Sequence, residues 1–241
     1  MHPIQVQQEA AISRAQSVVS AERIYAREAP EAQAAHRTSW DGLKRAFDVA
    51  FAALALWLLL PVLLLVALAI KLDSRGPLLF RQRRYGRDMC PFTVLKFRTM
   101  QDGASADSHR RYIASLVAGD EDEAPGLKKL VDDPRVTRVG SVLRRFSLDE
   151  LPQFANVLMG SMSLIGPRPA IPYELEHYLP RHYERFAVRP GLSGLWQVSG
   201  RNAIGFTEML DLDVEYARSF SFSTDLRVFL RTPVAMVRGA A

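Results

Sequence analysis

The chain has 241 residues and a formal net charge of +5, with a pI of about 9.5. It holds one cysteine, Cys90, which excludes an intrachain disulfide and a cysteine-based metal site and fits a reducing, cytoplasmic environment. The basic balance is compatible with nucleic acid, anionic lipid or a phosphate-bearing substrate as partner. The basic residues are not interleaved in a nucleic-acid-binding motif, which favours the last two partners.

Residues 1–40 form a polar tail rich in Ala, Gln, Glu and Ser, in which we identify no catalytic motif. The next segment, residues 41–75, contains the apolar run from Val49 to Ile70, which has no charged side chain. As a helix with about 1.5 Å per residue, this run covers roughly 33 Å, the hydrocarbon thickness of a bilayer. A buried helix of a soluble protein would need more surrounding protein than this chain supplies. The run therefore predicts a membrane helix.

Pro61 lies near the middle of this run, where a proline removes one backbone hydrogen bond and kinks or breaks a helix. Lysine and arginine flank the run on both sides, and such flanks are retained in the cytoplasm. The combination favours a re-entrant hairpin, which enters one leaflet and returns, over a simple span. We expect Asp48 at the interface, near Lys44 or Arg45, because a carboxylate inside lipid is costly.

Residues 76–241 are expected to form one cytoplasmic catalytic domain on the membrane surface. Their patterns predict a β-hairpin, several helices and an irregular glycine-rich stretch around Trp196. The predicted strands are Leu78–Arg81 and Pro91–Arg98, and the predicted helices are Ser108–Val117, Ser141–Arg145, Leu151–Leu158, Tyr173–Phe186 with an interruption at Pro180, Phe206–Ser219 and Thr224–Val237. The last helix is amphipathic, and both a membrane-surface helix and a packed terminal helix fit its pattern.

Two adjacent carboxylates, Asp149 and Glu150, stand among cations, with Arg144 and Arg145 just before them and Arg168 after them. A carboxylate can attack phosphorus to form a covalent intermediate, and carboxylates also supply the hard oxygen ligands that Mg²⁺ prefers. Phosphoryl transfer needs little more than positioning, a metal ion and cations for the developing charge. The pair is therefore the candidate centre for catalysis and for metal binding.

A purely structural interpretation fits the same residues. Ser147 and Glu150 have the spacing of a capping box at the start of a helix. Pro152 opposes this interpretation, because proline prefers the first helical position, which would place both carboxylates just before the helix. There the helix N-terminus would favour an ionised carboxylate and a bound phosphate. The residues alone leave both interpretations open.

Two further patterns carry weaker signals. Lys96 and Arg98 lie two apart, and so on one face of the second predicted strand, where they would clamp a phosphate or form a solvated edge. Asp211 and Asp213 resemble the DxD metal motif of many nucleotide-sugar glycosyltransferases. In a helix, however, their side chains would point about 200° apart, which favours a structural interpretation. The histidines show no metal-binding spacing.

Taken together, these motifs resemble the bacterial sugar transferases, or monotopic phosphoglycosyl transferases, and in particular the undecaprenyl-phosphate hexose-1-phosphate transferases of the exopolysaccharide-priming type. The resemblance spans about Lys44 to Arg238 and rests on many motifs in one order. These are KRAFDV, the proline-interrupted apolar run, KFRTM, DDPRVTRVGSVLRRFSLDELPQ, NVLMGSMSLIGPRP and RPGLSGLWQVSGRN.

The resemblance implies an α+β, mostly helical, monotopic membrane protein with a proline-broken re-entrant membrane helix, a short β-hairpin and amphipathic interfacial helices. It implies transfer of a sugar 1-phosphate, that of glucose or galactose, from a UDP-sugar to undecaprenyl phosphate. This transfer releases UMP and starts surface polysaccharide synthesis. The enzyme would use Mg²⁺ and bind membrane lipid but no nucleic acid. It would lie on the bacterial inner (cytoplasmic) membrane with its catalytic domain facing the cytoplasm, and a homodimer is compatible with the resemblance.

The resemblance also implies a role for individual residues. Asp149 would be the nucleophile that takes the phosphosugar, and Glu150 would assist around the metal or in activating the lipid phosphate. The expected substrate- and phosphate-binding residues are Lys96, Arg98, Arg144, Arg168 and Arg201.

Two departures from the family pattern stand out. Small members usually carry Ser-Pro at the helix break, whereas this chain has Leu60-Pro61 and so lacks a hydroxyl that could bond the freed backbone groups. Larger members carry further transmembrane helices before the domain, whereas this sequence has the polar tail, so it is expected to be the stand-alone catalytic form.

Two other classes of function compete with this one. A Leloir-type membrane glycosyltransferase, with Asp211 and Asp213 as its metal motif, would release UDP instead of UMP. A non-catalytic membrane-anchored scaffold, whose basic face attracts anionic lipid, would show no turnover and would tolerate Asp149→Asn.

Overall fold

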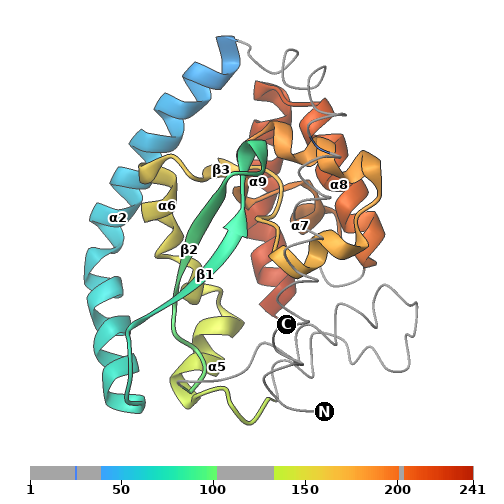
Figure 1. The fold of residues 1–241 in the computed structure, drawn as a ribbon. Helices are drawn as coiled ribbons and strands as arrows, with labels where there is room; N and C mark the ends of the chain where they lie inside the picture. The colour runs from blue at the N-terminus through green and yellow to red at the C-terminus, as the bar shows by residue number, and fades with distance from the viewer. Residues whose placement is uncertain (1–24, 26–38, 102–132, 201–203, 241) are drawn as a thin grey trace, which may run out of the picture.

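The computed structural model of the chain describes residue 25 and residues 39–101, 133–200 and 204–240. The long helix α2 runs along one side, and the β1–β2 hairpin lies between α2 and the helices that end the chain (Figure 1). With η for a 3₁₀ helix, the elements are α2 (Ser39–Asp73), β1 (Leu79–Tyr85), η1 (Arg87–Met89), β2 (Pro91–Phe97), α5 (Arg138–Arg145), η2 (Leu148–Glu150), α6 (Gln153–Met159), β3 (Ser163–Ile165), η3 (Pro172–His177), η4 (Pro180–Ala187), β4 (Gly191–Ser193), α7 (Leu195–Ser199), α8 (Phe206–Arg218) and α9 (Phe222–Ala240).

Helix α2 contains the apolar run predicted to lie in the membrane. Its apolar window has a mean hydropathy of 2.9 and is only 11% buried, and α2 is the one described helix long and apolar enough to cross a bilayer. The helix continues through Pro61 as one element of 35 residues. A proline removes only one backbone hydrogen bond, so the rest of the ladder holds the helix together. Figure 1 nevertheless shows that the axis of α2 changes direction partway along, so the expected break takes the form of a bend.

The first turns of α2 are bonded to the domain that follows. Asp48 is buried and accepts hydrogen bonds from the Ser163 hydroxyl (2.7 Å) and from the backbone N–H of Leu164 (3.1 Å). Lys44, also buried, forms an ion pair with Asp225 of α9 at 2.9 Å. These contacts keep the charged start of the helix within protein rather than lipid, as the cost of a carboxylate in lipid requires.

The last turns of α2 are bonded to the same domain. Val66 and Ile70 are buried in a cluster with Phe97 of β2. Asp73 ends the helix and accepts a hydrogen bond from the backbone N–H of Val139 at 3.1 Å, in the first turn of α5. A carboxylate at this position satisfies one of the unpaired N–H groups at a helix start. Both ends of α2 are therefore attached to one domain.

Strands β1 and β2 form the predicted antiparallel hairpin. Leu79 pairs with Phe97 at the open end, and Tyr85 pairs with Pro91 near the turn. The sequence predicts the first strand only as far as Arg81, whereas β1 continues to Tyr85. The extension has a tertiary cause, because the backbone of Tyr85 exchanges two hydrogen bonds with Ala170, at 2.9 and 3.3 Å. The hairpin is thereby joined to the turn that follows β3.

The sequence does not predict the short parallel pair of β3 with β4. The stretch around Trp196, expected to be irregular, instead contains β4 and the short helix α7. Gly166 follows β3, and its backbone N–H donates to the carbonyl oxygen of Ser193 at 2.9 Å. A Cβ atom on Gly166 would lie 2.3 Å from the carbonyl oxygen of Arg189, a backbone atom that cannot easily move away. Only glycine allows the two backbones to approach this closely.

We therefore expect Gly166→Ala to lower the free energy of unfolding by about 1 to 3 kcal/mol, the usual cost of overpacking. Thermal unfolding in detergent measures the effect. Gly42→Ala in α2 is the matched control, because a Cβ atom at Gly42 would have no heavy atom of another described residue within 4 Å, apart from its own helix backbone and chain neighbours. The control should be neutral or slightly stabilising. Equal melting temperatures for both variants would contradict the close approach.

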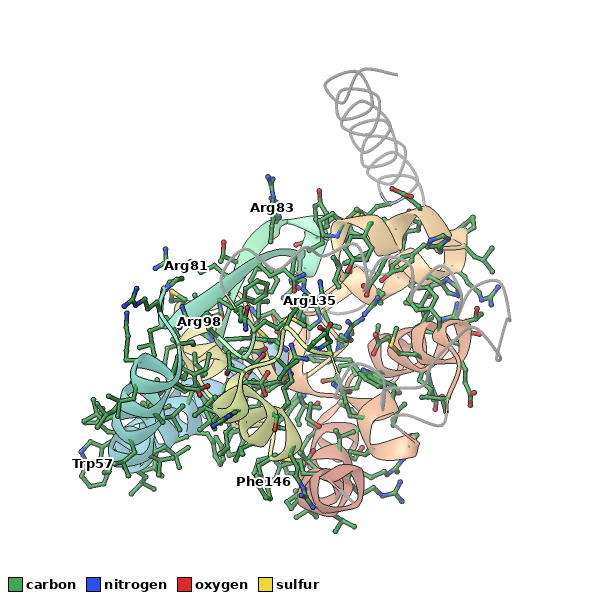
Figure 2. All side chains as sticks on the ribbon, turned by 90° about the horizontal axis from the view of Figure 1, so that it is seen from below. Trp57, Arg81, Arg83, Arg98, Arg135 and Phe146 are labelled. Carbon is green, nitrogen blue, oxygen red and sulfur yellow. The ribbon has the colours of Figure 1, made fainter. Side chains whose placement is uncertain are left out.

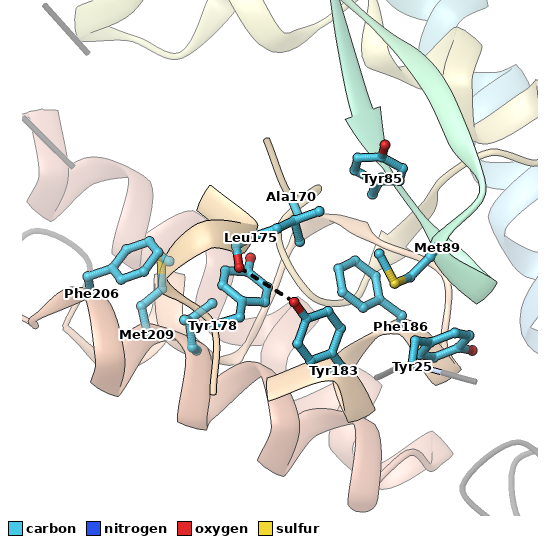
Figure 3. Packing of buried hydrophobic residues seen from close by; sticks show 11 residues of the cluster. Tyr25, Tyr85, Met89, Ala170, Leu175, Tyr178, Tyr183, Phe186, Phe206 and Met209 are labelled. Atoms are coloured by element: carbon cyan, nitrogen blue, oxygen red, sulfur yellow. Dashed lines mark hydrogen bonds between the residues drawn. The ribbon is translucent and has the colours of Figure 1, made fainter. Parts of the chain in front are cut away.

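The core beside the hairpin is rich in aromatic side chains (Figure 3). Tyr178, Tyr183 and Phe186 lie together, with ring centroids 5.8 to 6.3 Å apart. Met89 and Tyr25 complete this cluster on the side of the hairpin turn. The Tyr25 hydroxyl also donates to Asp88 at 2.9 Å, which brings one residue of the polar tail onto the domain.

Four of the remaining helices match the prediction, and one predicted helix takes a different form. Helices α5, α6, α8 and α9 occur where the sequence predicts helices, with shifted ends. The helix predicted over Tyr173–Phe186 is instead the two 3₁₀ helices η3 and η4, because Pro172 and Pro180 each begin a new one. Helix α9 buries Val228 and exposes Leu226 and Leu230, so it both packs on the core and presents an apolar stripe. The helix predicted near residues 108–117 lies outside the described residues.

Candidate active site

Asp149 and Glu150 lie in η2, directly before α6. Both carboxylates precede the helix, as predicted, although Pro152 takes the N-cap of α6 and not its first helical position. Ser147 has a left-handed backbone, with φ 55° and ψ 24°. Its carbonyl oxygen accepts the backbone N–H of Glu150 at 3.3 Å. This is a 3₁₀ turn and not the capping box, so the simplest structural interpretation of the pair does not hold.

The β-hairpin brings a cation to this pair. The Lys96 ammonium donates to Oε1 of Glu150 at 2.7 Å, and the two side chains are 26% and 40% exposed. Asn156 of α6 fixes the helix against β2, because its amide nitrogen donates to the carbonyl oxygen of Thr93 (2.7 Å) and its amide oxygen accepts from the N–H of Leu95 (3.0 Å). The position of η2 beside the strand thus follows from one buried side chain.

Asp149 lies in an environment that shifts its pKa strongly. Burial raises the pKa of Asp149 to about 6, the neighbouring Glu150 adds to the rise, and Lys96 and Arg144 oppose it. Arg144 is held in place by a hydrogen bond from its Nε to the Thr99 hydroxyl, at 2.8 Å. A carboxylate with a pKa near 6 is mainly ionised at neutral pH and more basic than an exposed aspartate. Asp149 is therefore a better nucleophile than an ordinary surface carboxylate.

The turn after β3 presents another cation. Nη1 of Arg168 donates to Oε1 of Glu174 at 2.8 Å, and the Arg168 side chain is 22% exposed. Arg84 of β1 donates to the carbonyl oxygen of Pro169 at 2.8 Å. Burial lowers the pKa of Arg84 to about 10, and the charges of Arg168 and Glu150 both act on it. Arg84 is thus within electrostatic reach of both the turn and the carboxylate pair.

Arg98 lies elsewhere. Strand β2 ends at Phe97, and the Arg98 guanidinium donates to the carbonyl oxygen and the hydroxyl of Ser74, at 2.8 and 2.9 Å, at the end of α2. The structure therefore does not bring Arg98 and Lys96 together as a clamp on one strand face, because the chain leaves the strand between them. Arg201 lies outside the described residues.

The two aspartates of the DxD pattern have different partners. Asp211 is 46% exposed and pairs with Arg181 at 2.9 Å, whereas Asp213 is fully buried and pairs with Arg185. Burial raises the pKa of Asp213 to about 6, although Arg185 beside it favours the charged form. Carboxylates that point to separate partners do not form a metal site, which supports the structural interpretation of this pattern.

The carboxylate pair can hold a metal ion only together with a substrate. Within residues 39–101, 133–200 and 204–240, no group of three His, Cys, Asp or Glu side chains could hold one. Mg²⁺, however, is commonly bound by one or two protein carboxylates plus substrate phosphates. Burial and the neighbouring Glu150 raise the pKa of Asp149, and a bound cation would favour its ionised form. The residues present therefore fit Mg²⁺ brought with a phosphate-bearing substrate.

Four site residues escape prediction from the sequence, namely Thr99, Asn156, Arg84 and Glu174. The first two stand inside the KFRTM and NVLMG motifs, so their motif membership was a usable signal. Arg84 lies in a basic run that by itself indicates only a membrane flank. Glu174 has no local pattern, since its partner is found only in the folded turn.

Comparison with known proteins identifies the family of the chain. The family model described as bacterial sugar transferase matches residues 39–239. The exopolysaccharide production protein ExoY of Rhizobium meliloti is 39% identical over 88% of this chain and 93% of its own length. The UDP-glucose:undecaprenyl-phosphate glucose-1-phosphate transferase of Caulobacter vibrioides is 43% identical over 81% of this chain and 70% of its own length. The Escherichia coli K12 protein of the same name is 40% identical over 79% of this chain and 39% of its own length. The chain belongs to the bacterial sugar transferase family, which confirms the resemblance found in its motifs.

Proposed function

We propose that this enzyme transfers a hexose 1-phosphate, glucose 1-phosphate or galactose 1-phosphate, from a UDP-sugar to undecaprenyl phosphate. The names of the Caulobacter and Escherichia relatives give UDP-glucose and undecaprenyl phosphate as their substrates. A relative from Erwinia amylovora is named a UDP-galactose-lipid carrier transferase. The product is a lipid-linked diphosphate sugar that starts a surface polysaccharide, in keeping with the name of ExoY.

The reaction consists of two displacements at one phosphorus. A carboxylate oxygen of Asp149 attacks the phosphorus that carries the sugar, the bond from this phosphorus to the bridging oxygen breaks, and UMP leaves with the electron pair. An oxygen of undecaprenyl phosphate then attacks the same phosphorus, and Asp149 leaves as a free carboxylate. Two such steps give ping-pong kinetics, because UMP departs before the lipid phosphate reacts.

The environment of Asp149 is the observation that supports this proposal most strongly. It combines a basic, mainly ionised carboxylate with nearby cations, which a nucleophile and a polyanionic donor both require. Lys96 and Arg144 supply positive charge beside the carboxylates, and Arg168 supplies it from the neighbouring turn. Glu150, which is bonded to Lys96, would assist around the metal or by activating the lipid phosphate.

Mg²⁺ would be held by Asp149 and Glu150 together with phosphate oxygens of the donor. When bound, it would neutralise negative charge on the diphosphate and so make UMP a better leaving group. The chain itself then orients the donor through its cations and holds Asp149 against the phosphorus.

We also propose that α2 enters and leaves the membrane on one face, with the catalytic domain on the cytoplasmic side of the inner membrane. Both ends of α2 are bonded to the same domain, through Asp48 and Asp73, whereas a span would place them on opposite sides of the bilayer. In Figure 2, Trp57 and Phe146 project from one side of the molecule and Arg81 and Arg83 from the opposite side. Trp57 is 70% exposed, so an apolar face would contact lipid and a basic face would contact water.

A cysteine-labelling experiment tests this topology. In a Cys90→Ser background, we expect Gly42→Cys and Arg75→Cys, which lie near opposite ends of α2, both to react with an impermeable maleimide added to inside-out membrane vesicles. Neither should react in intact spheroplasts. Labelling of one position from each side would show a span and contradict the re-entrant arrangement.

The nucleotide released tests the reaction itself. The purified enzyme in nanodiscs, with Mg²⁺, undecaprenyl phosphate and UDP-glucose or UDP-galactose, should release UMP. The alternative enzyme is a Leloir glycosyltransferase, which the DxD pattern of Asp211 and Asp213 suggests and which releases UDP. UDP as product would reject phosphosugar transfer, and the absence of any nucleotide release across a panel of UDP-sugars would favour the scaffold.

A further inference from the structure

An unusual number of buried charges surround a single turn residue, Arg168. Arg84, Glu174, Arg185 and Asp213 are 8%, 0%, 2% and 0% exposed. They come from β1, η3, η4 and α8, so four separate elements converge on this turn.

Each of the four charged residues bonds a different group of the turn. Two carboxylates accept hydrogen bonds from Arg168: Oε1 of Glu174 from its guanidinium at 2.8 Å, and Oδ2 of Asp213 from its backbone N–H at 3.3 Å. Two arginines donate to backbone carbonyl oxygens of the turn. The Arg185 guanidinium donates to that of Arg168, and Nη1 of Arg84 donates to that of Pro169 at 2.8 Å. The backbone and the side chain of one residue are thus fixed at the same time.

Glu174 is itself fixed at both carboxylate oxygens. Its Oε1 faces Arg168, and its Oε2 accepts the backbone N–H of Ile171 at 2.9 Å. Burial alone would raise the pKa of Glu174, but the charges of Arg168 and Arg84 outweigh it and lower the pKa, so the carboxylate is ionised. The Arg168 side chain, in contrast, stays 22% exposed. Part of this side chain therefore reaches solvent, while Nη1 of its guanidinium is held by the buried Glu174 carboxylate.

Such an arrangement is costly for a turn that needs only backbone hydrogen bonds to form. Each buried charge loses much of its hydration, and the pairing regains only part of it. Rigid support of one partly exposed arginine is useful where its guanidinium must meet an anion in a defined orientation. The hairpin joins this turn to the carboxylate pair, since β1 bonds the turn through Arg84 and β2 bonds Glu150 through Lys96.

We propose that Glu174 is a positioning residue for sugar-phosphate transfer, which orients the Arg168 guanidinium toward the diphosphate of the UDP-sugar. Glu174 does not touch the substrate, and it acts only through Arg168. This inference rests on the proposed function, because a diphosphate donor supplies the anion.

A double-mutant cycle on donor KM tests the proposal. We expect Glu174→Gln, which keeps the shape and removes the charge, to raise KM for the UDP-sugar about tenfold, the value of one well-placed charged hydrogen bond, with a smaller change in kcat. In an Arg168→Met background, the same Glu174→Gln change should leave KM nearly unaltered. Glu176→Gln, an exposed glutamate two residues along the chain, is the matched control and should behave as wild type.

A conservative variant separates orientation from charge balance. Glu174→Asp keeps the charge but withdraws the carboxylate by one methylene, so it should also raise KM if orientation matters. Melting temperatures of all variants show which remain folded. Wild-type KM for Glu174→Asp in a folded protein, or an equal effect of Glu174→Gln in both backgrounds, would overturn the proposal. A wild-type enzyme that releases no UMP would instead reject the proposed function, and the positioning role with it.

Discussion

Replacing Asp149 with asparagine should abolish UMP release, with a loss of about three orders of magnitude or more in turnover. The amide has nearly the same volume as the carboxylate, but it is a poor nucleophile toward phosphorus and carries no charge for a metal ion. Because burial disfavours the ionised form of Asp149, the variant should be at least as stable as the wild type. Turnover in nanodiscs and thermal unfolding, measured on the same preparation, check both parts.

Asp211→Asn is the matched control for this experiment. The same chemical change is made at an aspartate that is 46% exposed and paired with Arg181, where exposed ion pairs contribute little. Turnover should therefore stay close to the wild-type value. The reverse result, in which Asp211→Asn is inactive and Asp149→Asn is active, would move catalysis to the DxD pattern and support a Leloir glycosyltransferase.

Replacing Arg185 with methionine should destabilise the fold by about 3 kcal/mol or more, because it leaves Asp213 buried without its partner. Arg185 is 2% exposed, and it also donates hydrogen bonds to the Tyr178 hydroxyl and to the carbonyl oxygen of Arg168. Because this site is buried, water cannot replace the hydrogen bonds that Arg185 makes to these groups. In a protein of this size, the melting temperature should fall by roughly 10 °C.

Two further variants make the cause of that loss explicit. Arg218→Met breaks an ion pair with Glu184 whose arginine is 63% exposed, and it should change stability by less than about 1 kcal/mol. Adding Asp213→Leu to Arg185→Met removes the unpaired carboxylate, so part of the stability should return. A similar loss for Arg218→Met and Arg185→Met would contradict the distinction between exposed and buried pairs.

The sequence predicts those elements of the fold whose cause is local. The apolar run predicts α2, and the helical periodicity places α8 within one residue of its observed end. The β3–β4 pair depends instead on contacts between segments far apart in the chain, and each strand has only three residues, too few to show a pattern. For the same reason, Pro61 predicts a disturbance of α2 but not its form, which depends on what holds the two ends of the helix.

The site shows the same limit. The motif resemblance points to Asp149 and Glu150, whereas their residue types alone leave a structural interpretation open. Lys96 is predicted, but its pairing with Glu150 requires the hairpin to lie against η2. Strand alternation predicts Arg98 on the same face as Lys96, and this prediction fails because β2 ends at Phe97, one residue before Arg98. Glu174 could not be predicted, since its importance arises only from burial against Arg168.

The most direct test of the central claim is the mass of the peptide that contains Asp149 after the enzyme meets a UDP-sugar and Mg²⁺ without undecaprenyl phosphate. The covalent mechanism predicts one equivalent of UMP in solution and a hexose-phosphate adduct on Asp149, which disappears when the lipid phosphate is added. The Asp149→Asn variant should carry no adduct. Turnover that absolutely requires both substrates together, with no UMP burst and no adduct in rapidly quenched samples, would contradict the account and indicate direct transfer between them.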